Sequence, residues 1–195
     1  MNITPNEINT MQKSVDLVSG DVLVFGLGLG YFPFMIARKE EVKNITIIEN
    51  DPDIIEIFSK YLLPQFPHKE KIHIMQKDAY QVDADLINKF DYSFIDLWHN
   101  PVDGLPFFKH FKKLEEKSSC KYLYWLEDSF YAYLRRLVVL ILYDYIDNPN
   151  IKYDKSEEGK LLNELKRKID FSSLLSPNDL ITLISKQSLL SLLVS

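Results

Sequence analysis

A glycine run followed by a carboxylate gives this chain its clearest capacity to bind a polar ligand. Gly26, Gly28 and Gly30 come directly after an apolar segment, and Glu49 closes a second apolar segment nineteen residues after Gly30. Glycine lets a backbone turn tightly and approach a ligand closely, and a carboxylate accepts hydrogen bonds from both hydroxyls of a ribose. The spacing therefore predicts a site for a nucleotide-type cofactor. A dinucleotide motif would need a further small residue where Tyr31 stands.

Residues with acid–base and stacking chemistry follow further along the chain. His99 is a candidate general base, because histidine exchanges protons near neutral pH. Trp98 offers an aromatic face to a substrate or to a cation, and Asn100 and Glu127 are candidate substrate contacts. The structural alternatives are a solvated loop histidine and, for Glu127 and Asp128, a place at the start of the following helix.

Alternating strand and helix signals place these residues along one edge of a sheet. Runs of apolar, β-branched and aromatic residues predict strands, and capped or amphipathic segments between them predict helices. Such alternation is typical of an α/β fold with a doubly wound, mostly parallel sheet, in which ligands bind outside the carboxyl ends of the strands. Strands are expected at 21–26, 44–49, 71–76, 91–96 and 121–126, and helices at 5–18, 30–39, 52–62, 84–89, 105–117 and 129–147, with a loop at 97–106.

Capping signals mark helices at both ends of the chain. Thr4 to Glu7 forms a capping-box motif before the first helix, and Asp51, followed by a proline, begins another. Ser176 to Asp179 repeats this pattern before an apolar segment. We expect helices over 155–169 and 176–194, with a terminal strand as the alternative for the last segment.

The composition indicates one domain. At 195 residues and 46% hydrophobic content the chain can bury one proper core. We expect a single domain over 1–195, with an N-terminal helix (1–19), a cofactor-binding α/β core (20–147) and a helical C-terminal extension (148–195). The net charge of −5 argues against strong nucleic-acid binding. No targeting or membrane-spanning segment is visible, which predicts a cytoplasmic protein without a membrane partner.

The sequence also indicates what to expect of partners and metals. The apolar end of the chain, Leu192 to Val194, must pack on its own sheet, on a neighbouring helix or on a second subunit, so a homodimer through the C-terminal helix is one expectation. His68, His73 and His110 show no metal-ligand spacing, and no metal is expected. Cys120 is expected to pack rather than to react.

The glycine spacing and the acidic residues after successive strands resemble the class I S-adenosylmethionine-dependent methyltransferases. The glycines stand as Gly-x-Gly-x-Gly, Glu49, Asp78 and Asp96 follow the second, third and fourth expected strands, and the resemblance covers about residues 20–128. It implies a Rossmann-like sheet with S-adenosylmethionine as cofactor. It further implies that the glycines hold the methionine part, that Glu49 binds the ribose, that Asp78 and the Ala79 backbone meet the adenine amine, and that Asp96 lies beside the amino-acid part and the transferred group.

The chain departs from this family at several positions. Val24 stands where most of these methyltransferases have an acidic residue, and a valine there is similar to the spermidine synthase branch, which uses the decarboxylated cofactor. That branch carries Asp-x-x-Asp-Pro after the fourth strand, whereas here His99 replaces the second acid after Asp96 and the proline is displaced by one. Asn100-Pro101 falls four residues too late for the Asn-Pro-Pro-Tyr motif of amino-group methyltransferases. Asp78 has the alternative of capping a short helix.

These patterns together predict an S-adenosylmethionine-dependent methyltransferase that acts on a small-molecule acceptor. Asp96 and His99 are the expected catalytic residues, because methyl transfer needs an oriented acceptor and a base. Two alternatives stand beside this prediction. One is a methyltransferase-like binding module without catalysis, and the other is an aminopropyltransferase resembling spermidine synthase.

Overall fold

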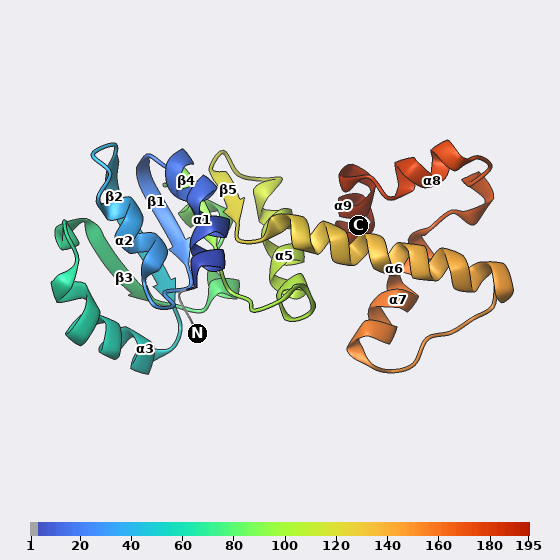
Figure 1. Cartoon of the computed structure of the whole chain (residues 1–195), viewed down its shortest axis with the longest axis horizontal. Coiled ribbons are helices and arrows are strands. Elements are labelled where there is room, and N and C mark those ends of the chain that lie inside the picture. The colour runs from blue at the N-terminus through green and yellow to red at the C-terminus, as the bar shows by residue number, and fades with distance from the viewer. Residues whose placement is uncertain (1–3) are drawn as a thin grey trace. The chain divides into compact units, whose positions relative to one another are not determined.

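The chain forms two compact units. The computed structural model describes residues 4–195. The first unit consists of two segments of the chain, one that ends at Trp98 and one over His110–Leu126 (Figure 1). The second unit takes in His99–Lys109 and Glu127–Ser195. The sequence predicts one domain whose extension begins at residue 148, whereas the second unit already includes the long helix before that point. No helix within residues 4–195 is long and apolar enough to cross a membrane.

The first unit is built on a five-stranded sheet in which every strand is parallel to its neighbours. The strand order is β3-β2-β1-β4-β5, so the doubly wound parallel sheet expected from the sequence is confirmed. All five strands lie within two residues of the expected positions at each end. Their bounds are β1 Gly20–Phe25, β2 Val42–Glu49, β3 Ile72–Gln76, β4 Tyr92–Ile95 and β5 Lys121–Tyr124.

Helices cover both faces of this sheet. Phe94 of β4 stacks on Phe32 of α2 (Tyr31–Ala37), with ring centroids 3.8 Å apart. Phe25 of β1 lies next to Val24, the register partner of Phe94, and therefore points to the other face. There it meets Phe111 of α5 (Pro101–Glu115), with centroids 4.6 Å apart. Strands buried on both sides explain the continuous apolar runs in the sequence.

The largest cluster of buried side chains lies on the α2 face of the sheet. It joins the strands to α1 (Pro5–Leu17), to α2 and to the segment after α3 (Pro52–Ile57). Close packing of such residues against the sheet is the main source of stability in this fold class. Its members are Val15, Val18, Val22, Val24, Leu27, Phe32, Ile36, Ala37, Val42, Ile45, Ile47, Phe58, Ile72 and Phe94.

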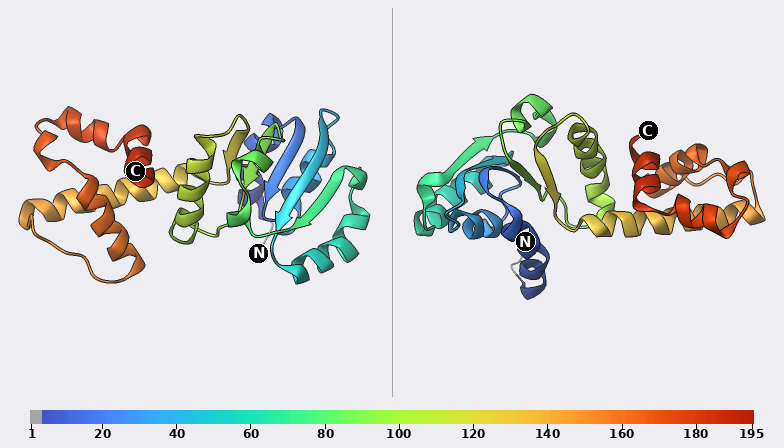
Figure 2. Two further views of the ribbon diagram at one scale, coloured as in Figure 1. Left: turned by 180° about the vertical axis from the view of Figure 1, so that it is seen from behind. Right: turned by 90° about the horizontal axis from the view of Figure 1, so that it is seen from above.

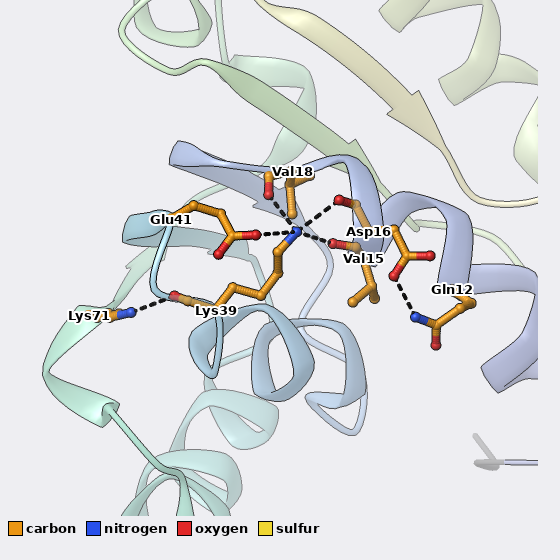
Figure 3. A network of polar contacts seen from close by, with 7 residues as sticks. All are labelled: Gln12, Val15, Asp16, Val18, Lys39, Glu41 and Lys71. Atoms are coloured by element: carbon orange, nitrogen blue, oxygen red, sulfur yellow. Dashed lines mark hydrogen bonds and ion pairs between the residues drawn. The ribbon is translucent and has the colours of Figure 1, made fainter.

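The first helix is anchored at its C-terminal end by a lysine from another segment. Lys39 Nζ donates to the carbonyl oxygens of Val15, Asp16 and Val18 at 2.8, 2.9 and 2.8 Å, and lies 3.4 Å from a carboxylate oxygen of Glu41 (Figure 3). The last carbonyls of a helix have no intrahelical partner, and a cation there also complements the helix dipole. Because the Lys39 side chain is only 16% exposed, this anchor fixes α1 to the α2–β2 turn.

The helix after β4 begins earlier than the sequence predicts. Residues 97–106 were expected to form a loop, but α5 begins at Pro101 and continues through Pro106, so this expectation is wrong for 101–106. Pro101 occupies the first helical position, which suits proline, and Asn100 caps the helix. Pro106 removes one intrahelical hydrogen bond in the second turn, and the helix tolerates this loss.

The helix expected over 52–62 is regular only in its first half. Asp51 caps α3 as expected, accepting hydrogen bonds from the backbone N–H groups of Asp53 and Ile54. After Ile57 the chain widens into a π-helical turn over Phe58–Leu62. The short helix expected at 84–89 is present as α4 (Ala84–Ile87).

The second unit is helical. It is built along α6 (Glu127–Asp147), with α7 (Glu157–Lys168) and α9 (Lys186–Val194) packed on it and α8 (Pro177–Leu183) between them in sequence (Figure 2). The terminal segment is helical rather than extended, as expected. The single helix expected over 176–194 is wrong, because α8 ends at Leu183 and Ser185 begins a new helix, where its side chain accepts a hydrogen bond from the Ser188 N–H.

Candidate cofactor site at the carboxyl ends of the strands

The glycine run lies where the strand order of the sheet reverses. From β1 the chain proceeds to β2 and β3 on one side, and β4 and β5 extend the sheet on the other. Ligands of open α/β sheets bind in the crevice at this switch point, outside the carboxyl ends of the strands. Gly26 directly follows β1 and Asp96 directly follows β4. The structure therefore places two predicted cofactor residues on the two strands that flank the switch point.

Gly26 is required by a close approach of two backbones. Its φ is +89°, and a Cβ at this position would lie 2.2 Å from the carbonyl oxygen of Asp96. The Asp96 N–H donates to the Phe25 carbonyl oxygen at 3.0 Å, which continues the sheet by one residue. Only glycine combines this conformation with this space, so the sequence at 26 is dictated by the junction of the two strands.

The other two glycines complete a tight turn into α2. Gly28 and Gly30 both have a positive φ, +53° and +76°. The Gly30 N–H donates to the Leu27 carbonyl oxygen at 2.9 Å, which closes the turn. A Cβ on Gly30 would lie 2.5 Å from the Phe58 ring, so this glycine lets the turn pack against the core.

Glu49 binds the glycine turn directly. Its Oε2 accepts a hydrogen bond from the Leu27 N–H at 3.1 Å, and its Oε1 accepts from the N–H groups of Asn50 and Asp51 at 2.8 and 3.0 Å. A carboxylate has about four lone-pair positions, so three accepted bonds leave room for a hydroxyl donor. The half-buried Glu49 thus joins the end of β2 to the turn after β1 and keeps acceptor capacity at the crevice.

Asp78 and Ala79 form a short helical turn after β3. Asp78 Oδ1 accepts from the Tyr80 N–H at 2.9 Å, which is the capping role considered for it from the sequence. Ala79 is buried and Asp78 is exposed, so capping leaves the carboxylate accessible to a ligand. The exposed Tyr80 side chain follows them, and burial, followed by the nearby charge of Asp78, raises its pKa.

His110 of α5 is a residue near this turn that sequence reasoning did not place there. Its ring meets the Tyr80 ring edge-on, with centroids 5.0 Å apart, and also contacts Phe111. Burial lowers the pKa of His110, and the charge of Asp78 partly opposes that effect. Among the described residues its buried Nε2 has no hydrogen-bond partner. No sequence signal could have found this contact, because it joins segments that are distant in the chain.

Trp98 is held inside the first unit. It is 5% exposed, and its indole Nε1 donates to the Trp125 carbonyl oxygen at 3.1 Å. Trp125 in turn donates from its own Nε1 to Thr10 Oγ1 at 3.0 Å. Both indole N–H groups are therefore satisfied within the unit. The substrate contact expected of Trp98 remains a prediction, and its observed contacts are those of a packed side chain.

His99 and Asn100 belong to the second unit and bond with the first turn of α5. Asp103 Oδ2 accepts from the His99 N–H at 3.0 Å and lies 3.3 Å from the His99 ring Nδ1. Asn100 Oδ1 accepts from the N–H groups of Val102 and Asp103, and Asp103 Oδ1 accepts from the Asn100 N–H. This reciprocal pair is a capping box. The His99 side chain remains 85% exposed, which matches the alternative of a solvated histidine, and its role as a base remains a prediction.

The capping arrangement changes the acidity of Asp103. Burial would raise the pKa of its carboxyl, but hydrogen bonds from the His99 and Asn100 N–H groups, together with the His99 ring, lower it overall. Hydrogen bonds to the ionised form favour that form. Asp103 is therefore an anion that orients the His99 ring.

Glu127 is the first residue of α6. Its Oε1 accepts from the Tyr131 hydroxyl at 3.4 Å, and Asp128 pairs with Lys186. The preceding Leu126 has a φ of +54°, which is uncommon for a bulky residue. Acidic residues in the first turn stabilise a helix, so the helix-start alternative is observed for both acids. The substrate role of Glu127 remains a prediction.

Comparisons of the whole chain with known proteins give matches among solved structures alone. No family model matches the sequence. No curated protein sequence matches it either.

Metal-binding side chains are not clustered in the part of the chain that the structure describes. No group of three or more His, Cys, Asp or Glu side chains within residues 4–195 could hold a metal ion.

The matched structures include the glycopeptide N-methyltransferase MtfA complexed with S-adenosyl-L-methionine, at 17% identity and a TM-score of 0.45, covering 64% of this chain and 59% of that one. Spermidine synthase from Thermotoga maritima matches at 16% identity and 0.45, covering 68% and 50%. M. jannaschii TYW2 in complex with AdoMet matches at 17% and 0.42, covering 57% and 50%.

The chain spans about half the length of the solved chains that it matches, 48% of the CtHen1-C methyltransferase domain for example. Likeness at this level leaves the functional argument to the residues of this chain.

Proposed function

We propose that the first unit binds S-adenosylmethionine at the carboxyl ends of β1, β2 and β4, and that the protein transfers its methyl group to a small-molecule acceptor. The observation that carries this proposal is the meeting of the glycine turn with two acidic residues at the switch point. Glu49 holds the turn through the Leu27 N–H, and Gly26 touches the backbone of Asp96. A polar ligand in this crevice would meet both carboxylates.

Each predicted cofactor residue has a role that its contacts support. Glu49 would accept a ribose hydroxyl with the capacity that its three backbone donors leave. The accessible carboxylate of Asp78 would accept from the adenine amine, with Ala79 beneath it. Asp96, at the end of β4, would attract the ammonium of the methionine part. Gly26, Gly28 and Gly30 supply the room for that part.

Little covalent chemistry is required of the protein. When bound, S-adenosylmethionine supplies an electrophilic methyl group on a positively charged sulfur. The chain orients the acceptor and removes its proton, and orientation is the larger of these contributions. His99 is our candidate for the base, because its exposed ring is oriented by Asp103 and can pass a proton to water. Asp96, which we place beside the methionine part of the cofactor, is the second candidate for a catalytic residue.

One observation favours the alternative of a binding module without catalysis. The loop expected to carry substrate chemistry forms the start of α5 instead, where Asn100 and Asp103 cap the helix, and Trp98 is buried. This module would bind the cofactor through the same crevice. An enzyme and a binding module would therefore bind the cofactor equally well, but only the enzyme would transfer its methyl group.

Titration calorimetry of the full chain tests the proposal. We expect binding of S-adenosylmethionine and of its demethylated product, and no binding of NAD. Failure of S-adenosylmethionine and its decarboxylated form to bind would overturn the cofactor assignment. A preference for the decarboxylated form would favour aminopropyl transfer. Methyl transfer from labelled cofactor to a panel of small amines, alcohols and thiols then separates an enzyme from a binding module.

A further inference from the structure

The second unit carries an exposed stripe of large side chains along α6. We define the α6 stripe as Arg136, Val139, Leu140, Tyr143 and Ile146. Its apolar members are all exposed, at 51% for Val139, 36% for Leu140, 68% for Tyr143 and 80% for Ile146. Contiguous apolar surface of this kind marks an interaction site on a protein.

The stripe lies opposite the face by which α6 packs within its own unit. The buried residues of α6 include Leu134, Val138 and Ile141, and α7 and α9 pack against the helix. In the right-hand view of Figure 2, α7 and α9 rise from the same side of α6 and the opposite side is uncovered. The unit therefore has its own core on one face of α6 and an apolar stripe on the other.

The spacing of the stripe is that of a helix-pairing seam. Positions 136, 139, 143 and 146 follow one another at intervals of three, four and three residues. This alternation places side chains in one line along a helix and is the a/d pattern of paired helices. In this pattern Leu140 flanks the seam. The partner that such a face fits is another helix with a matching line of apolar residues.

We infer that the α6 stripe is a self-association surface, on which two copies of the chain pair through antiparallel α6 helices. The opposite charges at the two ends of the stripe favour a second, antiparallel copy of the chain as the partner. Arg136 lies near one end and the exposed Asp147 lies just beyond the other. Antiparallel pairing about position 141 brings Arg136 of one copy beside Ile146 and Asp147 of the other, and brings Val139 opposite Tyr143. Parallel pairing would place the two Arg136 side chains together in the seam, where like charges repel.

The C-terminal helix offers less surface for a partner than its sequence suggests. The leucines of α9 that prompted the expectation of a homodimer, Leu189, Leu192 and Leu193, are buried at 1%, 9% and 2% exposure. Lys168 of α7 also donates to the Leu192 carbonyl oxygen at 2.8 Å. These leucines are part of the core of the second unit, so α9 leaves little apolar surface for a partner.

Sedimentation equilibrium of the full chain tests the inference. We expect a concentration-dependent monomer–dimer equilibrium, since a single helix pair gives a small interface. Val139→Asp should weaken dimerisation by roughly tenfold or more, because it places a charge beside Tyr143 of the other copy in the apolar middle of the seam. The control is Ile57→Asp on α3, where an isoleucine outside the stripe is 56% exposed, and it should leave the equilibrium unchanged. A wild-type chain that stays monomeric at its highest soluble concentration would overturn the inference.

A charge exchange tests the antiparallel arrangement. Arg136→Glu should weaken the dimer by opposing Asp147 of the other copy, and the double variant Arg136→Glu, Asp147→Arg should restore it. Both residues are exposed, so circular dichroism should show no change in helix content. A double variant that dimerises no better than Arg136→Glu would contradict this pairing. Restoration would also separate specific pairing from nonspecific aggregation of an apolar face.

Discussion

The two units hold their candidate site residues in different ways. In the first unit, Glu49 reaches Leu27 across 22 positions of sequence, and Gly26 meets the backbone of Asp96 from another strand. In the second unit, His99 and Asn100 bond with Asp103, three or four positions away. Contacts between distant segments form only when the sheet has formed, whereas a helix cap needs only one helical turn. The first arrangement therefore depends on the assembled sheet, and the second depends on the start of a single helix.

Removal of the His99 ring would test whether a locally held residue nevertheless performs chemistry. If His99 is the base, His99→Ala should lower turnover by roughly 10²- to 10⁴-fold while cofactor affinity is unchanged. The measurement is single-turnover methyl transfer at saturating cofactor, with calorimetry for affinity. Normal turnover would remove His99 from the mechanism and leave Asp96 as the candidate.

A methyl group at position 26 would break the long-range arrangement of the first unit. Its Cβ would meet the Asp96 carbonyl oxygen at 2.2 Å, in a backbone conformation with φ of +89°. We expect Gly26→Ala to lower the free energy of unfolding by about 4 kcal/mol, through combined backbone strain and overpacking. Urea denaturation followed by circular dichroism measures this. An unchanged unfolding midpoint would show that the two strands need not approach so closely.

Glu49→Ala would sharpen the comparison by separating loop support from ligand binding. We expect a loss of about 2–4 kcal/mol in the binding free energy of S-adenosylmethionine, because charge-assisted hydrogen bonds to the ribose disappear. Calorimetry with a ligand whose ribose lacks both hydroxyls is the control, and there the loss should largely vanish. An equal loss for both ligands would assign Glu49 to holding the Leu27 N–H alone.

The anchor of α1 provides a smaller test of long-range contacts in the first unit. Lys39→Met keeps the apolar stem but leaves three carbonyl oxygens without their donor. We expect a loss of about 2 kcal/mol in the free energy of unfolding. The control is Lys43→Met at an exposed position of β2, which should change stability by less than about 0.5 kcal/mol. Equal effects of the two variants would mean that the three hydrogen bonds contribute nothing specific.

Asn100→Ala addresses the local arrangement in the second unit. Loss of the cap at the start of α5 should lower the free energy of unfolding by about 1 kcal/mol. Asn100→Asp keeps a capping acceptor and should retain most of that stability. If Asn100 is a cap and nothing more, neither variant should change cofactor affinity or turnover. A large loss of turnover in Asn100→Ala with stability restored by added osmolyte would instead identify a substrate contact.

Local signals predicted much of the fold. The strands, the glycine turn and the caps at Thr4, Asp51 and Ser176 each depend on a few neighbouring residues, and each was expected from the sequence. A loop was expected up to Pro106, but a proline this early in α5 is compatible with a helix. The break at Ser185 was missed because the apolar pattern runs through it.

Long-range contacts could not be predicted in the same way. The meeting of His110 with Tyr80 depends on how α5 packs over the turn after β3. The bond between Glu49 and the Leu27 N–H follows from the pairing of β1 with β2. The sequence indicated that a carboxylate stands near the glycines, but only the sheet shows that it shapes their turn.

The atoms that would clash with an added side chain differ between Gly26 and Gly30. This difference determines whether a second mutation can compensate for a substitution at each position. At Gly30 the nearest atoms to an added methyl group belong to the Phe58 ring, so a smaller residue at 58 would relieve part of the clash. At Gly26 the obstacle is the Asp96 carbonyl, which every amino acid possesses. A library that varies the surroundings should therefore yield compensated variants at position 30 and none at position 26, whatever cofactor the crevice binds.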